Sequence, residues 1–151
     1  MEKVIASDEE MQTFGESIGR VFRGGEVIEL VGDVGAGKTT LTKGIARGLG
    51  IDAVVQSPTF TISRQYDARD GLRLAHYDFY RLVDAGIMTS ELEETIASSQ
   101  FVTVIEWSEI VAGVLPKDRL TVVIELSSET ERQVTLHGDG EHGAAVIGGL
   151  A

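Results

Sequence analysis

Apolar and polar positions recur with a helical period near the start of the chain. Four apolar residues, three or four positions apart, predict an amphipathic helix over residues 8–22: Met11, Phe14, Ile18 and Val21. Ser7 is followed three residues later by Glu10, the capping-box pattern that marks a helix start. The pattern therefore predicts both the helix and the residue at which it begins.

Short apolar or alternating runs predict strands along the rest of the chain. The run at 101–105 is too apolar to face water on both sides, which indicates a central position in a sheet. Two pairs of runs flank polar turns and predict hairpins. We expect these elements: helices at 8–22, 39–49 and 89–98, strands at 1–6, 27–31 and 101–105, and hairpins of 59–66 with 72–79 and 120–126 with 132–136. Helical crossovers mixed with hairpins predict an α/β fold with helices on both faces of a mixed central sheet.

Composition limits the class of protein. The 151 residues carry 13 Lys and Arg against 24 Asp and Glu, a formal net charge of −11. The acidic balance argues against strong direct binding of tRNA or other nucleic acid, which needs clustered basic side chains. With no cysteine, disulfide scaffolds, cysteine-ligated zinc and thiol catalysis are excluded. No apolar run is long enough to cross a bilayer and the start lacks a signal-peptide pattern, so we expect a cytoplasmic protein without membrane attachment.

The end of the chain differs in composition from the rest. It holds five glycines: Gly138, Gly140, Gly143, Gly148 and Gly149. We therefore expect a single domain over 1–137, followed by a Gly-rich, loosely ordered tail over 138–151.

The strongest chemical signal is the segment Gly32-Asp33-Val34-Gly35-Ala36-Gly37-Lys38-Thr39, which fits G-x-x-x-x-G-K-[ST] at every fixed position. Glycines let such a loop wrap its backbone N–H groups around phosphate oxygens, and the following helix N-terminus favours the same anion. Lys38 can bridge the β- and γ-phosphates, and the Thr39 hydroxyl can ligate Mg²⁺. A buried strand precedes the loop and a helical pattern follows it, so we expect a P-loop NTPase-like, three-layer α/β/α fold.

Two acidic residues are candidates for the rest of the metal site. Glu106 follows the predicted central strand, and the carboxyl ends of such strands are where ligands bind. Asp78 ends another strand and shares a face with His76 by period-two alternation. The alternative for each is an ordinary surface carboxylate. The guanine-reading pattern N-K-x-D is absent from the sequence, which favours adenine.

Several segments in this order resemble one family. They are the P-loop, Ser57-Pro58-Thr59-Phe60-Thr61, His76-Tyr77-Asp78-Phe79-Tyr80-Arg81-Leu82 and Ile105-Glu106-Trp107. Together, over about residues 7–136, they resemble the bacterial tRNA threonylcarbamoyladenosine biosynthesis ATPase family, TsaE. The resemblance implies a cytoplasmic ATPase that binds ATP or ADP with Mg²⁺. It also implies two protein partners, the threonylcarbamoyl transferase subunit and its non-catalytic paralogue. Together the three modify the adenosine beside the anticodon, and ATP binding and hydrolysis reset the transferase.

The resemblance also implies roles for individual residues. Asp78 and Lys38 are the expected catalytic residues, with Asp78 activating or positioning the attacking water. Thr39 and Glu106 are the expected metal ligands. The expected nucleotide contacts are Asp33, Val34, Gly35, Ala36, Gly37, Lys38, Thr39, Thr40, Thr59 and Trp107. A core tryptophan is the alternative for Trp107.

The sequence departs from the family pattern in two places. Met11 stands where members commonly carry Thr, and the segment 84–98 lacks the usual acidic-then-Gly-Ile/Leu pattern. Neither place supports a transferred contact.

Two other functions stay open. A small-molecule P-loop kinase would need a lid with paired arginines, for which Arg64, Arg69 and Arg73 are the candidates. A nucleotide-gated adaptor would act on its partner by binding alone. For the ATPase, Arg81 is the best candidate for an arginine finger, and its alternative is a surface salt bridge.

Overall fold

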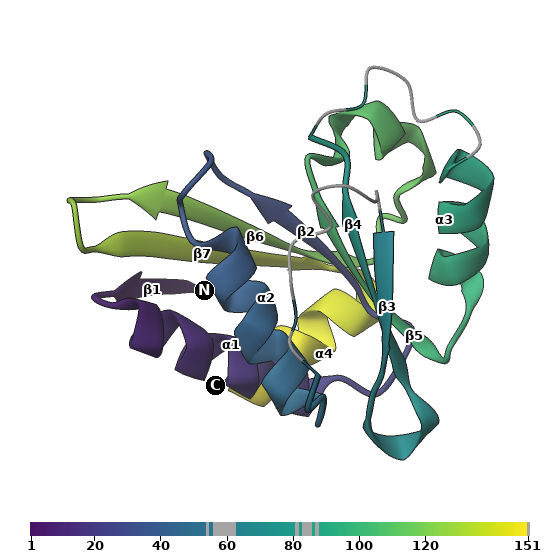
Figure 1. Ribbon diagram of the computed structural model, residues 1–151, viewed down its shortest axis with the longest axis horizontal. Helices are drawn as coiled ribbons and strands as arrows, with labels where there is room; N and C mark the ends of the chain where they lie inside the picture. Colours follow the sequence, from purple (N-terminus) through teal and green to yellow (C-terminus); the bar gives the residue numbers. More distant parts are fainter. Residues whose placement is uncertain (54, 56–62, 81, 83–85, 87, 151) are drawn as a thin grey trace.

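The computed structural model of the protein describes residues 1–53, 55, 63–80, 82, 86 and 88–150. A seven-stranded sheet runs through its middle in the order β1-β7-β6-β2-β5-β4-β3 (Figure 1). The strands are β1 (Glu2–Ile5), β2 (Val27–Val31), β3 (Ser63–Asp67), β4 (Arg73–Asp78), β5 (Phe101–Glu106), β6 (Arg119–Leu126) and β7 (Arg132–Asp139).

The sheet is mixed, as the pattern of crossovers and hairpins predicted. The strands β4, β5, β2 and β6 are parallel neighbours, while β3, β7 and β1 pair antiparallel at the two sides. The predicted central strand, β5, lies between β2 and β4. Both predicted hairpins are present, as β3 with β4 and β6 with β7, although residues 59–62 of the first lie outside the described residues.

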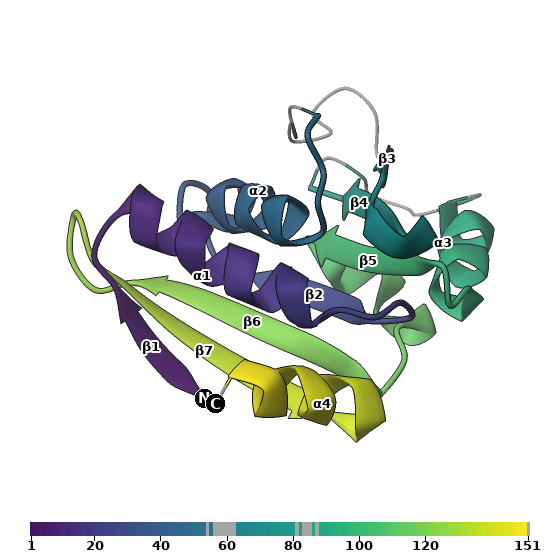
Figure 2. The ribbon, with the colours of Figure 1, turned by 90° about the horizontal axis from the view of Figure 1, so that it is seen from below.

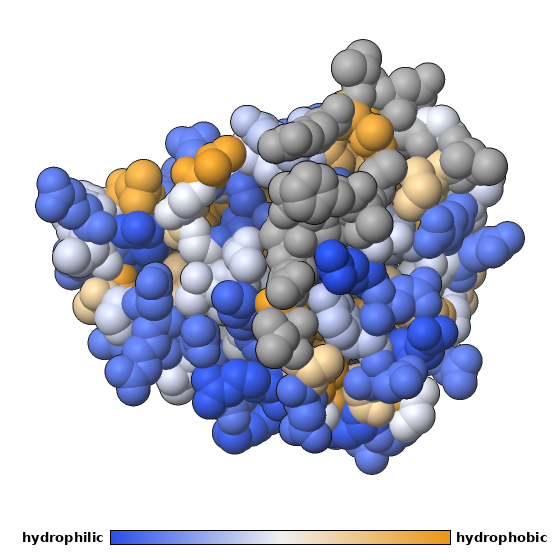
Figure 3. Space-filling model, in the orientation of Figure 1, coloured by the Kyte–Doolittle hydropathy of each residue, from blue (hydrophilic) through white to orange (hydrophobic). Residues whose placement is uncertain are grey.

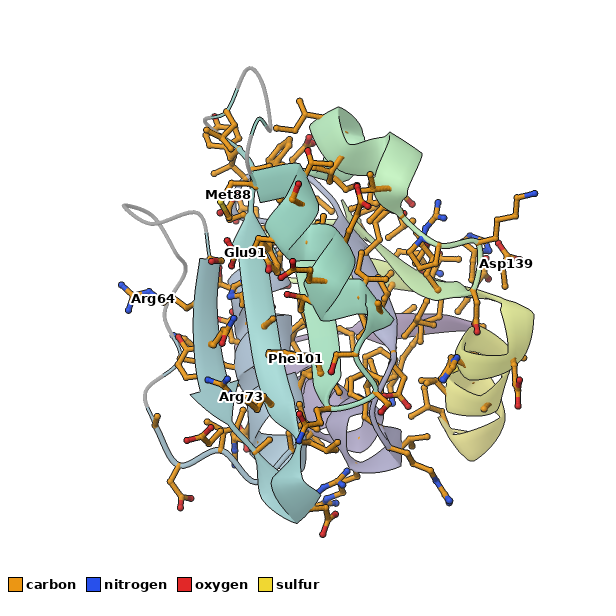
Figure 4. The ribbon with its side chains drawn as sticks, turned by 90° about the vertical axis from the view of Figure 1, so that its right-hand side faces the viewer. Arg64, Arg73, Met88, Glu91, Phe101 and Asp139 are labelled. Carbon is orange, nitrogen blue, oxygen red and sulfur yellow. The ribbon has the colours of Figure 1, made fainter. Side chains whose placement is uncertain are left out.

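Helices cover both faces of the sheet, which confirms the three-layer α/β/α prediction. The helices α1 (Asp8–Val21), α2 (Lys38–Gly48) and α4 (Gly140–Leu150) pack into one core cluster on one face. The helix α3 (Met88–Ala97) and the 3₁₀ segment η2 (Ser108–Val114) pack into a second cluster on the other. Figure 2 shows α1 and α2 side by side, and Figure 4 shows α3 in front of the sheet. No helix in the described part of the chain is both long and apolar enough to cross a membrane.

The packing of α1 on α2 depends on glycines. A Cβ built on Gly15 would lie 2.4 Å from the Leu41 carbonyl oxygen, and one built on Gly44 would lie 2.2 Å from that of Gln12. Gly19 and Gly48 make equally close approaches one turn further along. The two backbones therefore nearly touch, which fixes the position of α2 and of the loop at its start.

The predicted cap of α1 is present, since Ser7 Oγ accepts the Glu10 N–H at 3.1 Å.

The expectation of a loosely ordered tail is wrong, because β7 extends to Asp139 and residues 140–150 form α4. Asp118 supplies the cap for α4: its Oδ1 accepts the N–H groups of His142 at 2.9 Å and Gly143 at 3.1 Å. The glycines permit close packing, since a Cβ on Gly138 would lie 2.3 Å from the Gly143 carbonyl oxygen. Val146 is buried in the core that α4 shares with α1.

Candidate functional site

The Gly-rich loop joins β2 to α2, as the motif predicted. Its backbone takes the left-handed conformation at Gly35 (φ 81°) and Gly37 (φ 115°), which favours glycine. The Ala36 N–H donates to the Asp33 carbonyl at 3.0 Å, and α2 begins at Lys38. The loop therefore ends at a helix N-terminus, the geometry that binds phosphate.

The loop lies at the surface of the molecule. Asp33, Val34 and Gly35 are exposed, and Val34 reaches 69%. Figure 3 shows hydrophobic side chains on the surface in this region, where Val31 at the end of β2 is also exposed. A ligand can therefore reach the loop from solvent.

Lys38 directs its ammonium group back over the loop. Nζ donates to the carbonyl oxygens of Gly32 and Asp33, and it lies 4.1 Å from the centroid of the Trp107 ring. Burial lowers the pKa of Lys38, while the negative charges of Glu106, Asp78, Asp33 and Glu109 act in the opposite direction. The ammonium thus lies within electrostatic range of both predicted acidic residues.

Glu106 and Asp78 are direct neighbours on adjacent strands. They are paired in register at the carboxyl ends of β5 and β4, and Glu106 is also paired with Leu30, two residues before the loop. Glu106 is only 3% exposed. Asp78 Oδ1 accepts the Tyr80 N–H at 2.9 Å. The sheet therefore brings both predicted carboxylates to the edge where the loop lies.

Trp107 follows Glu106 and takes a left-handed backbone conformation with φ 56°. Its ring is half-buried and lies 4.8 Å from that of Tyr80, tilted by 44°. The ring lies against the Lys38 ammonium and also packs against the second core cluster, so its contact with a nucleotide stays a prediction.

Residues 5–134 match the model of a protein family described as "Threonylcarbamoyl adenosine biosynthesis protein TsaE". The chain belongs to the TsaE family. The family takes part in tRNA threonylcarbamoyladenosine biosynthesis. The predicted family resemblance is therefore confirmed.

Individual relatives agree with the family model. The tRNA threonylcarbamoyladenosine biosynthesis protein TsaE of Bacillus subtilis is 44% identical over 117 residues, which cover 77% of this chain and 72% of the relative. The protein of the same name from Streptomyces coelicolor is 37% identical over 139 residues, covering 89% and 94%. The crystal structure of Bacillus subtilis YdiB matches with a TM-score of 0.82 and 31% identity, covering 99% of this chain and 93% of that one.

Two candidate residues of this TsaE-family chain lie outside the described residues. They are Thr59, expected at the nucleotide, and Arg81, the candidate arginine finger. Their roles stay predictions.

The arginines of the predicted kinase lid are dispersed. Arg69 donates from Nη2 to the carbonyls of Gly19 and Phe22, so its side chain satisfies carbonyl groups at the C-terminal end of α1. Arg73 lies at the start of β4, at the opposite end of the strand from Asp78, and its guanidinium lies 5.5 Å from the Phe101 ring. Arg64 projects outward from the edge strand β3 (Figure 4). These three side chains do not form a lid over the P-loop.

The two departures from the TsaE pattern lie partly within the described residues, which leave out 84, 85 and 87. Met11 is buried, and its Cε lies 3.2 Å from where a Cβ on Gly37 would be, so its methyl group packs beneath the loop. The segment 88–97 forms α3, whose Thr95 hydroxyl lies 3.1 Å from that of Tyr77. This contact joins α3 to the sheet.

Sequence reasoning missed two residues that contact the site. His76 Nε2 lies 2.6 Å from Glu106 Oε2, and both side chains are buried. Arg132, at the start of β7, donates from Nε to the Ala36 carbonyl of the loop at 3.1 Å. The period-two alternation that placed His76 on the same face as Asp78 was a signal that His76 lies at the site. No local pattern marks Arg132, which is far away in sequence.

Proposed function

We propose that this protein is a Mg²⁺-dependent ATP hydrolase that supports threonylcarbamoylation of the tRNA adenosine beside the anticodon. It acts on a partner complex of the threonylcarbamoyl transferase subunit and its non-catalytic paralogue, in the cytoplasm. The observation that carries the enzymatic part is the grouping of Lys38, Glu106 and Asp78 beside a helix-capping glycine loop. A phosphate-binding loop, a cation and paired acids in one place are the parts that phosphoryl transfer requires.

Binding follows from the charges of the loop. The N–H groups of the loop and of the first turn of α2 would donate hydrogen bonds to the β- and γ-phosphate oxygens. The helix N-terminus stabilises the negative charge of these oxygens. The Lys38 ammonium, now bonded to the Gly32 and Asp33 carbonyls, would exchange these for the stronger charge-assisted bonds to phosphate.

The donor set fits Mg²⁺. No group of three or more His, Cys, Asp or Glu side chains able to hold a metal occurs in the part of the chain that the structure describes. Mg²⁺ at nucleotide sites normally needs only one or two protein carboxylates and takes its other ligands from phosphate and water. Thr39 Oγ1 and the Glu106 carboxylate would hold the ion, which neutralises charge on the phosphates when bound.

Asp78 would orient the attacking water. It lies beside Glu106 at the strand end, and the Tyr80 N–H holds one of its oxygens. The Asp78 carboxylate would accept a hydrogen bond from a water in line with the γ-phosphate, so that catalysis comes from positioning and charge. The sequence places no arginine clearly as a finger over the γ-phosphate, with Arg81 as the best candidate, so we expect slow turnover by the isolated protein.

The role in tRNA modification is proposed to pass through the protein partners. A net charge of −11 opposes contact with the phosphate backbone, so tight tRNA binding by this chain alone is not expected.

Calorimetric titration of ATP and ADP with Mg²⁺ tests the site. Lys38→Ala should abolish binding or hydrolysis, whereas Lys43→Ala, an exposed lysine on the same helix, should leave both unchanged. Absence of nucleotide binding by folded wild-type protein would refute the proposal. Phosphorylated product with an added acceptor would indicate the kinase instead. Retained cellular function in a variant that binds but does not hydrolyse ATP would indicate the adaptor.

A further inference from the structure

We propose that His76 is a positioning residue that holds the Glu106 carboxylate in the orientation needed for Mg²⁺. The inference rests on the proposed function, because it assigns a role toward the same metal site. His76 would not contact the nucleotide or the ion. It would act only through its hydrogen bond to Glu106.

The sheet places the two side chains on one face. His76 on β4 pairs in register with Val104 on β5, and Asp78 pairs with Glu106, so His76 and Glu106 are diagonal neighbours on adjacent strands. Both residues point toward the layer that contains α2, as do the apolar residues Leu74 and Val104 beside them. A carboxylate in this position cannot be held by solvent, because Glu106 is only 3% exposed.

The direction of the hydrogen bond is fixed by its partners. His76 is fully buried, and its Nε2 lies 2.6 Å from Glu106 Oε2. A carboxylate accepts, so Nε2 carries the proton and donates. His76 Nδ1 has no hydrogen-bond partner among the residues that the structure describes.

This hydrogen bond makes the two oxygens of the Glu106 carboxylate differ in their partners. Oε2 is held by the imidazole, so that rotation about the last side-chain bond of Glu106 is restricted and Oε1 would be left to bind the ion. Hydrogen bonds that orient metal-binding carboxylates typically change metal affinity by about 10–100-fold when they are removed. A histidine retained only for packing would leave the metal requirement unchanged.

Two amide substitutions of similar polarity separate these roles. Gln places its side-chain nitrogen near the position of Nε2, while Asn places it near Nδ1, out of reach of Glu106. We expect His76→Asn to raise the Mg²⁺ concentration for half-maximal enhancement of ADP binding by about 10–100-fold, and His76→Gln to stay within about threefold of wild type. Affinity for ADP in EDTA should be the same in all three proteins.

The outcomes decide between the proposals. An unchanged Mg²⁺ requirement in His76→Asn, or an equal shift in both variants, overturns the role of His76 and leaves the proposed function intact. Absence of Mg²⁺-dependent nucleotide binding in the wild type removes the proposed function and the inference with it. In a Glu106→Ala background, His76→Asn should have no further effect on the Mg²⁺ requirement, and an additional tenfold shift would contradict the inference.

A measurement on the unaltered protein remains if the Asn variant does not fold. The ¹⁵N signal of His76 Nε2 should shift when Mg²⁺ is added to the ADP complex, because Mg²⁺ at Glu106 would withdraw charge from the carboxylate that accepts the hydrogen bond of the Nε2–H. Addition of Mg²⁺ without a shift of this signal would overturn the inference.

Discussion

The ammonium of Lys38 lies 4.1 Å from the centroid of the Trp107 ring, so the lysine at the end of the Gly-rich loop and the aromatic residue after Glu106 form a cation–π pair. The same ammonium donates to two carbonyls of its own loop. The proposed binding of phosphate would therefore require this ammonium to change partners.

This pair predicts an optical signal of nucleotide binding. The chain contains one tryptophan, so its fluorescence reports on Trp107 alone. We expect the emission of Trp107 to change on titration with Mg²⁺ and ADP, because Lys38 moves from the ring toward the β-phosphate. The Lys38→Ala variant should show a different starting emission and no response. A full response in that variant would mean that Lys38 and Trp107 are not coupled.

The position of Asp78 predicts a separation of binding from hydrolysis. Asp78→Asn keeps the oxygen that accepts the Tyr80 N–H and removes the charge. We expect the affinity for ATP to stay within about threefold and the hydrolysis rate to fall about 10²- to 10⁴-fold, the range for loss of a positioned acid or base. Asp52→Asn, at an exposed aspartate, serves as the control. Unchanged turnover in Asp78→Asn would remove Asp78 from the reaction.

Arg132 is predicted to support the loop from outside. Its Nε–H holds the Ala36 carbonyl, and its Nη1 bonds the carbonyl of Glu131 at 3.1 Å. Arg132→Met should weaken ATP binding roughly 2- to 10-fold, the effect of one lost hydrogen bond on the ordering of the loop. Arg47→Met removes the same charge from the exposed side of α2 and should leave affinity unchanged. Equal losses in the two variants would indicate a general charge effect.

The parts of this fold that sequence predicted are those determined by local pattern. The loop and its flanking strand and helix follow from one contiguous motif, and α1 begins at its capping box. Glu106 was predicted because an acidic residue that follows a very apolar strand lies at the carboxyl end of a central strand. The register that brings Asp78 beside it follows from the parallel pairing of β4 with β5.

The missed features depend on contacts between distant segments. The bonds of His76 to Glu106 and of Arg132 to Ala36 join segments 30 and 96 residues apart, and no spacing rule relates them. The helix α4 was missed because glycine is a poor helix former. Its glycines instead allow close contact with β7, a tertiary effect that composition does not reveal.

The glycines between α1 and α2 give a stability prediction. Gly44→Ala places a methyl group against the Gln12 carbonyl, where a built Cβ lies at 2.2 Å, and the obstruction is backbone that cannot move aside. We expect a loss of about 1–3 kcal/mol in unfolding free energy despite the higher helix propensity of alanine. Gly148→Ala is the matched control, because this exposed glycine in α4 has no atom within 4 Å of a built Cβ. Urea unfolding should show the Gly148 variant as stable as wild type or more so.

The contact of His142 with Asp118 predicts a pH-dependent contribution to stability. The hydrogen bond from His142 Nδ1 to Asp118 Oδ2, at 2.6 Å, is the main cause that raises the pKa of His142, against the smaller opposing effect of burial. Burial alone would raise the pKa of Asp118, but the hydrogen bonds from His142 and from the Gly143 and His142 N–H groups together lower it.

The two shifts define the pH range in which this contact stabilises the fold. A raised pKa in the folded protein means that the His142 contribution is complete below its ordinary value of about 6.5 and is lost as pH rises through the folded value. The lowered pKa of Asp118 means that its contribution is present above about 3.8 and is lost as pH falls. In thermal unfolding, we expect the difference in Tm between wild type and His142→Gln to be largest between these limits and to shrink toward alkaline pH. A difference that is constant from acid to alkaline pH would show that the charge on His142 does not stabilise α4.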